Sequence, residues 1–151
     1  MINGKNSIKL YNVMFPIWML ILFPVVWLVV FPVNFIVDSL VLIVCMFKFG
    51  IADKWQAYRR HILKIFAFGM ISDIIGAALL LVVVMLDLGL RGDELYITAP
   101  AMLISALLIF IFNYCITFKK SDKSLRFKFA AVLAIVTAPY TFLIPLDWIY
   151  Y

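Results

Sequence analysis

The chain has 151 residues, of which 67% are hydrophobic and only 14% are charged, and its mean hydropathy is +1.13. These values lie far outside the range of water-soluble domains, so a soluble fold is excluded. The net charge of +5 does not indicate nucleic-acid binding, because the basic residues lie in short stretches between long apolar runs, as in membrane proteins. We therefore expect an all-α integral membrane helical bundle, with residues 1–151 forming a single transmembrane domain.

The apolar runs predict five transmembrane helices, because each run is close to the length that crosses the hydrocarbon core. The expected spans are 11–31, 33–47, 65–86, 97–118 and 129–149. The first span is expected to remain in the mature protein. The run that follows Lys5 and Lys9 is too long for a cleavable signal peptide, and no small-residue cleavage site follows it.

Phe-Pro pairs recur at 15/16, 23/24 and 31/32, within the first two spans. Pro24 is expected to kink the first helix. Pro32, Val33 and Asn34 are expected to form the turn that reverses the chain, so that the basic residues on either side of 13–47 share one membrane face. The second span is short, about 22 Å of helix. The alternative is therefore four spans, with 13–47 partly re-entrant.

Residues 51–64 lead into the third span and predict an interfacial amphipathic segment. Apolar residues at helical spacing are Ile51, Trp55, Tyr58 and Ile62. The bases on the other faces, which are expected to bind the headgroups of anionic lipids, are Lys54, Arg59 and Arg60. The alternative is an extension of the third helix beyond the membrane, because no proline or glycine separates this segment from Ile65.

The positions of the basic residues predict the orientation. Five spans with the N-terminus inside place every lysine and arginine except Arg91 in the cytoplasm, as the positive-inside rule requires. The C-terminus then lies outside, where Trp148, Tyr150 and Tyr151 form an aromatic anchor. We expect a multi-pass protein of the cell membrane, of the bacterial plasma membrane type.

Small residues mark the helix faces that are expected to approach other helices closely. The expected packing residues of the third and fifth spans are Gly69, Ser72, Gly76, Ala130, Ala134 and Ala138. Packing within the chain is one interpretation. The other is contact with further chains, in a homo-oligomer or a heteromeric membrane complex.

Two acids lie inside the expected spans without a basic partner, Asp38 and Asp73. Counting 1.5 Å per residue, Asp38 lies about 9 Å from the outer edge and Asp73 about 12 Å from the inner edge. An unpaired carboxylate in hydrocarbon must be protonated, face a wet cavity or hold a cation. Asn113 is placed to hydrogen-bond Asp73, and Ser105 lies near the depth of Asp38. These four residues are the candidates for an ion or proton relay; the alternative is a pair of purely structural acids.

Other chemistries find no support in the sequence. The lone histidine, His61, has no Cys, His or Asp cluster at zinc spacing around it. No phosphate-binding glycine loop, dinucleotide fingerprint or serine nucleophile elbow is present. We therefore expect no metal, no cofactor and no enzymatic activity, and the different expected depths of Asp38 and Asp73 argue further against an intramembrane enzyme.

The function expected from these features is that of an ion or small-solute channel or transporter, or of a membrane subunit of one. The alternative is a non-transporting assembly, immunity or regulatory subunit that binds another membrane protein. A weaker alternative is a lipid-modifying enzyme that uses the segment from Trp55 to His61 at the headgroup level.

Overall fold

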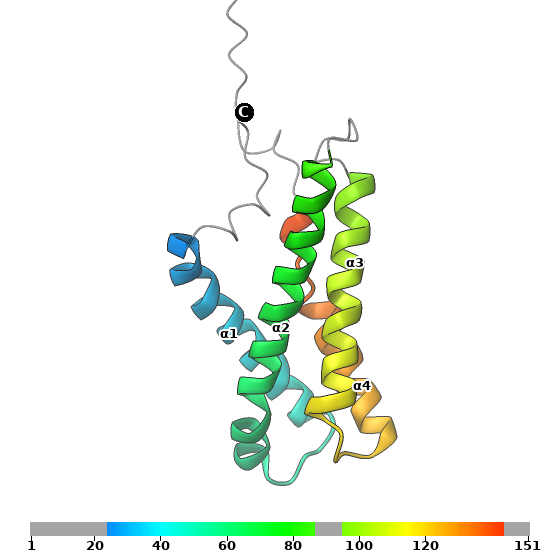
Figure 1. The fold of residues 1–151 in the computed structure, drawn as a ribbon. Coiled ribbons are helices and arrows are strands. Elements are labelled where there is room, and N and C mark those ends of the chain that lie inside the picture. The colour runs from blue at the N-terminus through cyan, green and yellow to red at the C-terminus, as the bar shows by residue number, and fades with distance from the viewer. Residues whose placement is uncertain (1–23, 87–94, 144–151) are drawn as a thin grey trace, which may run out of the picture.

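The computed structural model describes residues 24–86 and 95–143, and every element in these two stretches is helical (Figure 1). The first stretch holds α1 (Pro24–Lys48) and α2 (Lys54–Met85). The second holds α3 (Leu95–Phe112), the π-helical segment η2 (Asn113–Thr117), α4 (Lys123–Val136) and the 3₁₀ segment η3 (Tyr140–Leu143). The expected all-α fold is confirmed for this part of the chain.

Within the described ranges, four helical stretches are long and apolar enough to cross a membrane: Trp27–Lys48, Lys54–Val83, Leu95–Thr117 and Lys123–Leu143. Their outward-facing side chains are large and apolar; Leu28 and Leu103, for example, are 77% and 62% exposed. Apolar surface of this extent is stable in lipid and not in water. These features fit a small multi-pass membrane protein.

The expected turn at residues 32–34 is wrong, because α1 runs without interruption from Pro24 to Lys48. The first two expected spans therefore share one helix from residue 24 onward, while residues 11–23 lie outside the described part. Pro32 lies inside α1 and lacks only the N–H that would bond to the carbonyl of Leu28. A turn would free several backbone groups in lipid, so a helix that continues through the proline costs less.

Residues 54–64 are the first turns of α2, which continues to Met85 without a break; the position of this segment relative to the membrane stays a prediction. Before this segment, α1 ends at Lys48, and Gly50 adopts the left-handed conformation with φ of 66°. Ile51 N–H donates to the Met46 carbonyl at 3.1 Å across this turn. Glycine closes helices in this way because it has no Cβ to clash.

The last expected span, 129–149, is not one continuous helix. α4 begins earlier, at Lys123, and ends at Val136, and the 3₁₀ segment η3 follows only at Tyr140. Pro139 explains the break, because it has no N–H to bond to the carbonyl of Ile135 and it disfavours the helical conformation of Ala138. The hydroxyl of Tyr140 donates to that Ile135 carbonyl instead.

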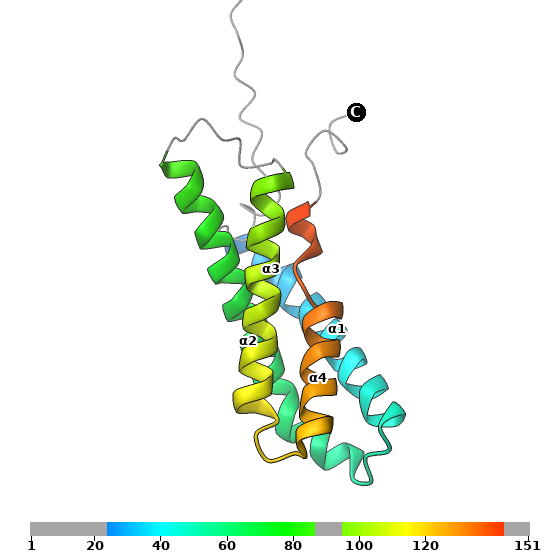
Figure 2. The same ribbon diagram turned by 90° about the vertical axis from the view of Figure 1, so that its right-hand side faces the viewer.

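The helices alternate in direction, so that the loops 49–53 and 118–122 lie at the same end of the bundle (Figures 1 and 2). We call this the basic end. Its basic residues are Lys48, Lys54, Arg59, Arg60, Lys64, Lys119, Lys120, Lys123, Arg126 and Lys128. That these bases share one end agrees with the expected grouping. Lys5, Lys9 and Arg91 lie outside the described residues, and the orientation of the protein in the membrane stays a prediction.

The helices enclose two apolar clusters. The cluster toward the basic end joins α1, α2, α3 and α4 and includes Leu42, Ile65, Ile109 and Leu133, all at most 1% exposed. The cluster toward the other end packs η3, through Phe142, against α2 and α3. α2 and α3 run side by side, whereas α1 crosses α2 at an angle (Figures 1 and 2). The polar site lies between these clusters.

A candidate cation site at the break in α4

Asp38 of α1 and Asp73 of α2 line the same cavity, which has a volume of about 100 Å³. Both side chains are buried, at 4% and 7% exposed, and the two carboxyls interact electrostatically. The expectation that they lie at different depths is wrong. Because α1 does not turn at Pro32, Asp38 lies about 21 Å along the helix from Pro24, near the middle of the bundle.

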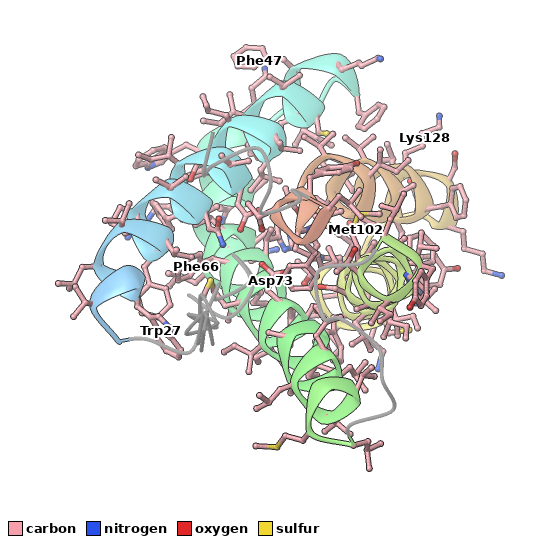
Figure 3. All side chains as sticks on the ribbon, turned by 90° about the horizontal axis from the view of Figure 1, so that it is seen from above. Trp27, Phe47, Phe66, Asp73, Met102 and Lys128 are labelled. Atoms are coloured by element: carbon pink, nitrogen blue, oxygen red, sulfur yellow. The ribbon has the colours of Figure 1, made fainter. Side chains whose placement is uncertain are left out.

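Asp73 has a hydrogen-bond donor on the neighbouring helix. The hydroxyl of Ser105 on α3 donates to Oδ1 of Asp73 at 3.0 Å, and Ser105 is fully buried. Asp73 points toward the centre of the bundle, whereas Phe47 and Lys128 lie at its periphery (Figure 3). Ser105 is thus a partner of Asp73, and not only a residue near the depth of Asp38.

Asn113 does not form the expected hydrogen bond with Asp73. Its amide nitrogen donates to the Ile109 carbonyl of its own helix at 2.9 Å, and its amide oxygen has no partner among the described residues. Asn113 lies about 12 Å along the helix from Ser105, toward the basic end. The structure therefore assigns Asn113 to a different level of the bundle from the two acids.

Asp38 makes no hydrogen bond or ion pair with any other residue in the described ranges. It lies over Gly69 of α2, where an added Cβ would be 3.7 Å from Oδ2 of Asp38. An alanine at Gly69 would therefore make only an ordinary van der Waals contact with this carboxyl. None of the bases in the described ranges lines the cavity, so no lysine or arginine of these ranges neutralises the pair.

The break in α4 forms the third wall of the cavity, through Val136, Thr137 and Ala138. Thr137 ends the helix, with both its N–H and its hydroxyl donating to the Leu133 carbonyl at 2.8 Å. No donor within the described ranges reaches the carbonyls of Val136 or Thr137. Carbonyls freed by a discontinuous membrane helix are common cation ligands in transporters.

Asn34 completes the polar lining. It precedes Asp38 by one helical turn on the same face of α1, and its amide nitrogen lies 3.4 Å from Sδ of Met70. Sequence reasoning missed Asn34 because it was assigned to a turn, and missed Thr137 because the last span was read as unbroken. The sequence held a signal for each residue. For Asn34 it was the i to i+4 spacing from Asp38, and for Thr137 it was the Ala-Pro pair at 138/139 that follows it.

Comparison with protein-family models, curated proteins and solved structures finds no match to this chain. Its function is therefore argued from the site.

The expected packing residues lie inside the bundle. Gly76 is closely covered, since an added Cβ would be 2.9 Å from Phe142 Cε2 and 3.2 Å from Ser105 Cβ. Ser72, Ala130, Ala134 and Ala138 are buried within the chain. These residues make contacts among the helices of one molecule, and contact with further chains stays a prediction.

The expected headgroup-binding residues are at the basic end, far from the acids. Arg59 and Arg60 are exposed, and Lys54 Nζ lies 4.9 Å from the centre of the Phe47 ring. In the described part of the chain, no group of three or more His, Cys, Asp or Glu residues is placed to hold a metal ion. The donor set at the cavity is thus two carboxylates, one amide and neutral backbone oxygens.

Proposed function

We propose that the protein moves a small cation, either a proton or a monovalent metal ion, across the membrane by way of Asp38 and Asp73. The observation that supports this proposal is the shared cavity. Two carboxyls from two helices meet in it, buried and without a basic partner in the part of the chain that the structure describes.

Electrostatics limits the states that such a pair can adopt. Two ionised carboxylates this close in a low-dielectric interior repel each other, and each would also lose its hydration. The pair is stable when a proton or a cation neutralises the charge. A site whose stability depends on a bound cation is suited to take one up and release it.

The geometry also favours a small ion over a larger substrate. A volume of about 100 Å³ holds a few water molecules or a partly hydrated ion. A lipid headgroup or a peptide does not fit. The break at Thr137 supplies free carbonyls at the same level, which matches the design of ion sites in discontinuous helices.

Flux measurements on reconstituted vesicles test the proposal. Asp73→Asn and Asp38→Asn preserve shape but remove the exchangeable charge, so each should abolish cation-dependent flux, measured with a pH-sensitive dye and with a sodium-sensitive dye. Asp53→Asn is the matched control, because Asp53 is exposed at the basic end. Wild-type flux in Asp73→Asn, with the variant folded, would show that the acid pair is not the transport site.

The acid pair also bears on the expectation of no enzymatic activity. That expectation drew support from different depths of the two acids, and this support is lost because the acids line one cavity. We still favour transport, because acid–base catalysis on a lipid or a peptide needs room for the reacting group beside the acids. Hydrolysis of lipid or peptide substrates by the purified protein, lost in Asp73→Asn, would favour the enzyme instead.

Contact with a second copy or with another membrane protein remains part of the proposal. Because the small residues are buried within the chain, such a contact would have to use lipid-facing surface. Purification in a mild native detergent distinguishes the alternatives. A single species of this chain alone supports an independent transporter, and a stable heterologous companion supports a subunit.

A further inference from the structure

A second cavity lies at the basic end of the bundle. It has a volume of about 110 Å³, and its lining includes His61 of α2 and Ser121 of the 118–122 loop. Leu42 and Met46 of α1 also line this cavity. We call it the His61 cavity.

Three unsatisfied polar atoms of the described ranges lie on α2, which contributes His61 to this cavity, and on η2, which directly precedes the lining residue Phe118. Nδ1 of His61, Oδ1 of Asn113 and Oγ1 of Thr117 are buried and have no hydrogen-bond partner among the described residues. Asn113 and Thr117 are 0% and 4% exposed, and the His61 ring lies within hydrogen-bonding reach of the Thr117 backbone. Each such orphan costs about 1–3 kcal/mol unless it is satisfied. Buried groups of this kind are normally satisfied by ordered water.

These atoms follow the face of α3 and η2 that also carries Ser105. Ser105, Asn113 and Thr117 are all buried, at 0%, 0% and 4% exposed, and so lie on the inward side of this helical run. Ser105 holds Asp73, so this polar stripe runs from the acid pair toward the basic end. The π-helical geometry of η2, closed by Phe118 N–H to the Asn113 carbonyl at 3.0 Å, is a common feature of functional sites in helices.

α1 connects the two cavities on its own inner face. Asn34 and Asp38 line the acid cavity, and Leu42 and Met46, the next residues at four-residue spacing, line the His61 cavity. Leu42 follows Asp38 by one helical turn and is 1% exposed. Ile65 of α2 and Ile109 of α3, also 1% exposed, belong to the same apolar cluster. We call Leu42, Ile65 and Ile109 the Leu42 layer.

We propose that the cation handled by Asp38 and Asp73 exchanges with the basic end through the His61 cavity, along Thr117 and Asn113, and that the Leu42 layer closes this path in the conformation described. This inference rests on the proposed function. It adds a second site that water reaches. It also states from which side of the membrane the cation reaches the acid pair, namely the side of the basic end.

Cysteine accessibility tests the path. In a background with Cys45→Ala and Cys115→Ala, Thr117→Cys and Asn113→Cys place thiols on it. The probe is a membrane-impermeant, cationic methanethiosulfonate added to reconstituted vesicles, and intact-protein mass spectrometry measures the labelled fraction. Thr117→Cys should be labelled to the same final fraction as Ser124→Cys, an exposed position at the basic end, because both are reached from one side.

The adjacent position supplies the matched control. Ile116 is 48% exposed on the outer surface of the bundle, so Ile116→Cys faces lipid and should not be labelled, because a thiol in lipid forms little reactive thiolate. Labelling of Ser124→Cys without labelling of Thr117→Cys or Asn113→Cys would overturn the path. If either Thr117→Cys or Asn113→Cys fails to fold, labelling of the other variant tests the path.

A second experiment tests the barrier. Ser105→Cys should be unreactive alone and should become labelled when Leu42→Ala is added, whereas Leu40→Ala, at a lipid-facing position that is 57% exposed, should leave it unreactive. Labelling of Ser105→Cys without Leu42→Ala would show that this layer is not the barrier. The two proposals fail separately. Unlabelled path residues with flux that depends on Asp73 overturn only the access route, and labelled path residues with flux that is independent of Asp73 overturn the transport function.

Discussion

Ser105 of α3 donates a hydrogen bond of 3.0 Å to Oδ1 of Asp73 on α2, and this contact makes the two acids unequal. Asp73 has a fixed donor, whereas Asp38 has no hydrogen-bond partner within the described ranges. A proton or cation at this site therefore meets one oriented carboxyl and one that is free to adjust. The predictions below test the parts of the structure that hold this arrangement.

Ser105→Ala should lower the free energy of unfolding by about 0.6–1.7 kcal/mol, the average and the maximum found for hydrogen bonds between the helices of a membrane protein. The variant also leaves Asp73 without its donor, so flux should fall. Denaturation in mixed detergent and flux in vesicles measure the two effects. Ser72→Ala is the control, because Ser72 is equally buried but donates only to Phe68 of its own helix at 2.7 Å. Equal losses in both variants would contradict a special role for Ser105.

Gly76→Ala should be destabilising by about 1–3 kcal/mol, because its Cβ would overlap the Phe142 ring and the chain around Ser105. Gly69→Ala should be neutral or stabilising by about 0.5–1 kcal/mol, since its nearest contact would be an ordinary 3.7 Å and alanine favours the helix. The midpoints of unfolding of the two variants should therefore move in opposite directions. A stable Gly76→Ala variant would show that η3 does not pack on α2 as described.

Pro139→Ala should restore the missing N–H opposite the Ile135 carbonyl and allow α4 to continue through the cavity wall. We expect flux to be lost, because a continuous helix would no longer leave backbone carbonyls free at the cavity wall. Pro32→Ala is the control, because Pro32 lies exposed within α1 and away from the cavity. If Pro139→Ala and Pro32→Ala show equal flux, the break in α4 is not required for transport.

Arg126→Lys should loosen η2. Nε of Arg126 donates to the Tyr114 carbonyl, and its guanidinium lies 3.9 Å from the centre of the Tyr114 ring. Lysine keeps the charge but loses the planar contact, which predicts a loss of about 0.5–2 kcal/mol in unfolding free energy. Lys128→Ala should cost less, because Lys128 Nζ is 5.9 Å from the Phe49 ring. A larger loss in Lys128→Ala would contradict this assignment.

The sequence identified many of the residues of the site but did not predict which of them lie together. Asp38 and Asp73 were evident as unpaired acids in apolar runs, and Gly69 and Gly76 as positions of close approach. Their pairing depended on the path of α1. A proline ends a helix in water more readily than in lipid, where every freed backbone group needs a partner, and the expected turn at Pro32 placed Asp38 at the wrong depth.

The partner of Asp73 shows the same limit. Ser105 and Asn113 are both buried polar residues on one face of the same helical run, and helical periodicity alone does not rank them. The relative shift of α2 and α3 along their axes decides which of the two residues meets Asp73. That shift follows from packing at Gly76, Ala101 and Phe142. A displacement of two helical turns would have exchanged the two residues.

The sequence by itself determined that the chain is helical, that its surroundings are lipid, and that basic residues gather at one end, because hydrophobicity and charge act residue by residue and need no knowledge of neighbours. Only the tertiary structure decided that Asp38, Asp73 and the break in α4 share one cavity, and that Ser105 and not Asn113 holds Asp73. Those relations depend on how far each helix continues and how it packs against the others, and both are set by contacts between residues distant in the chain.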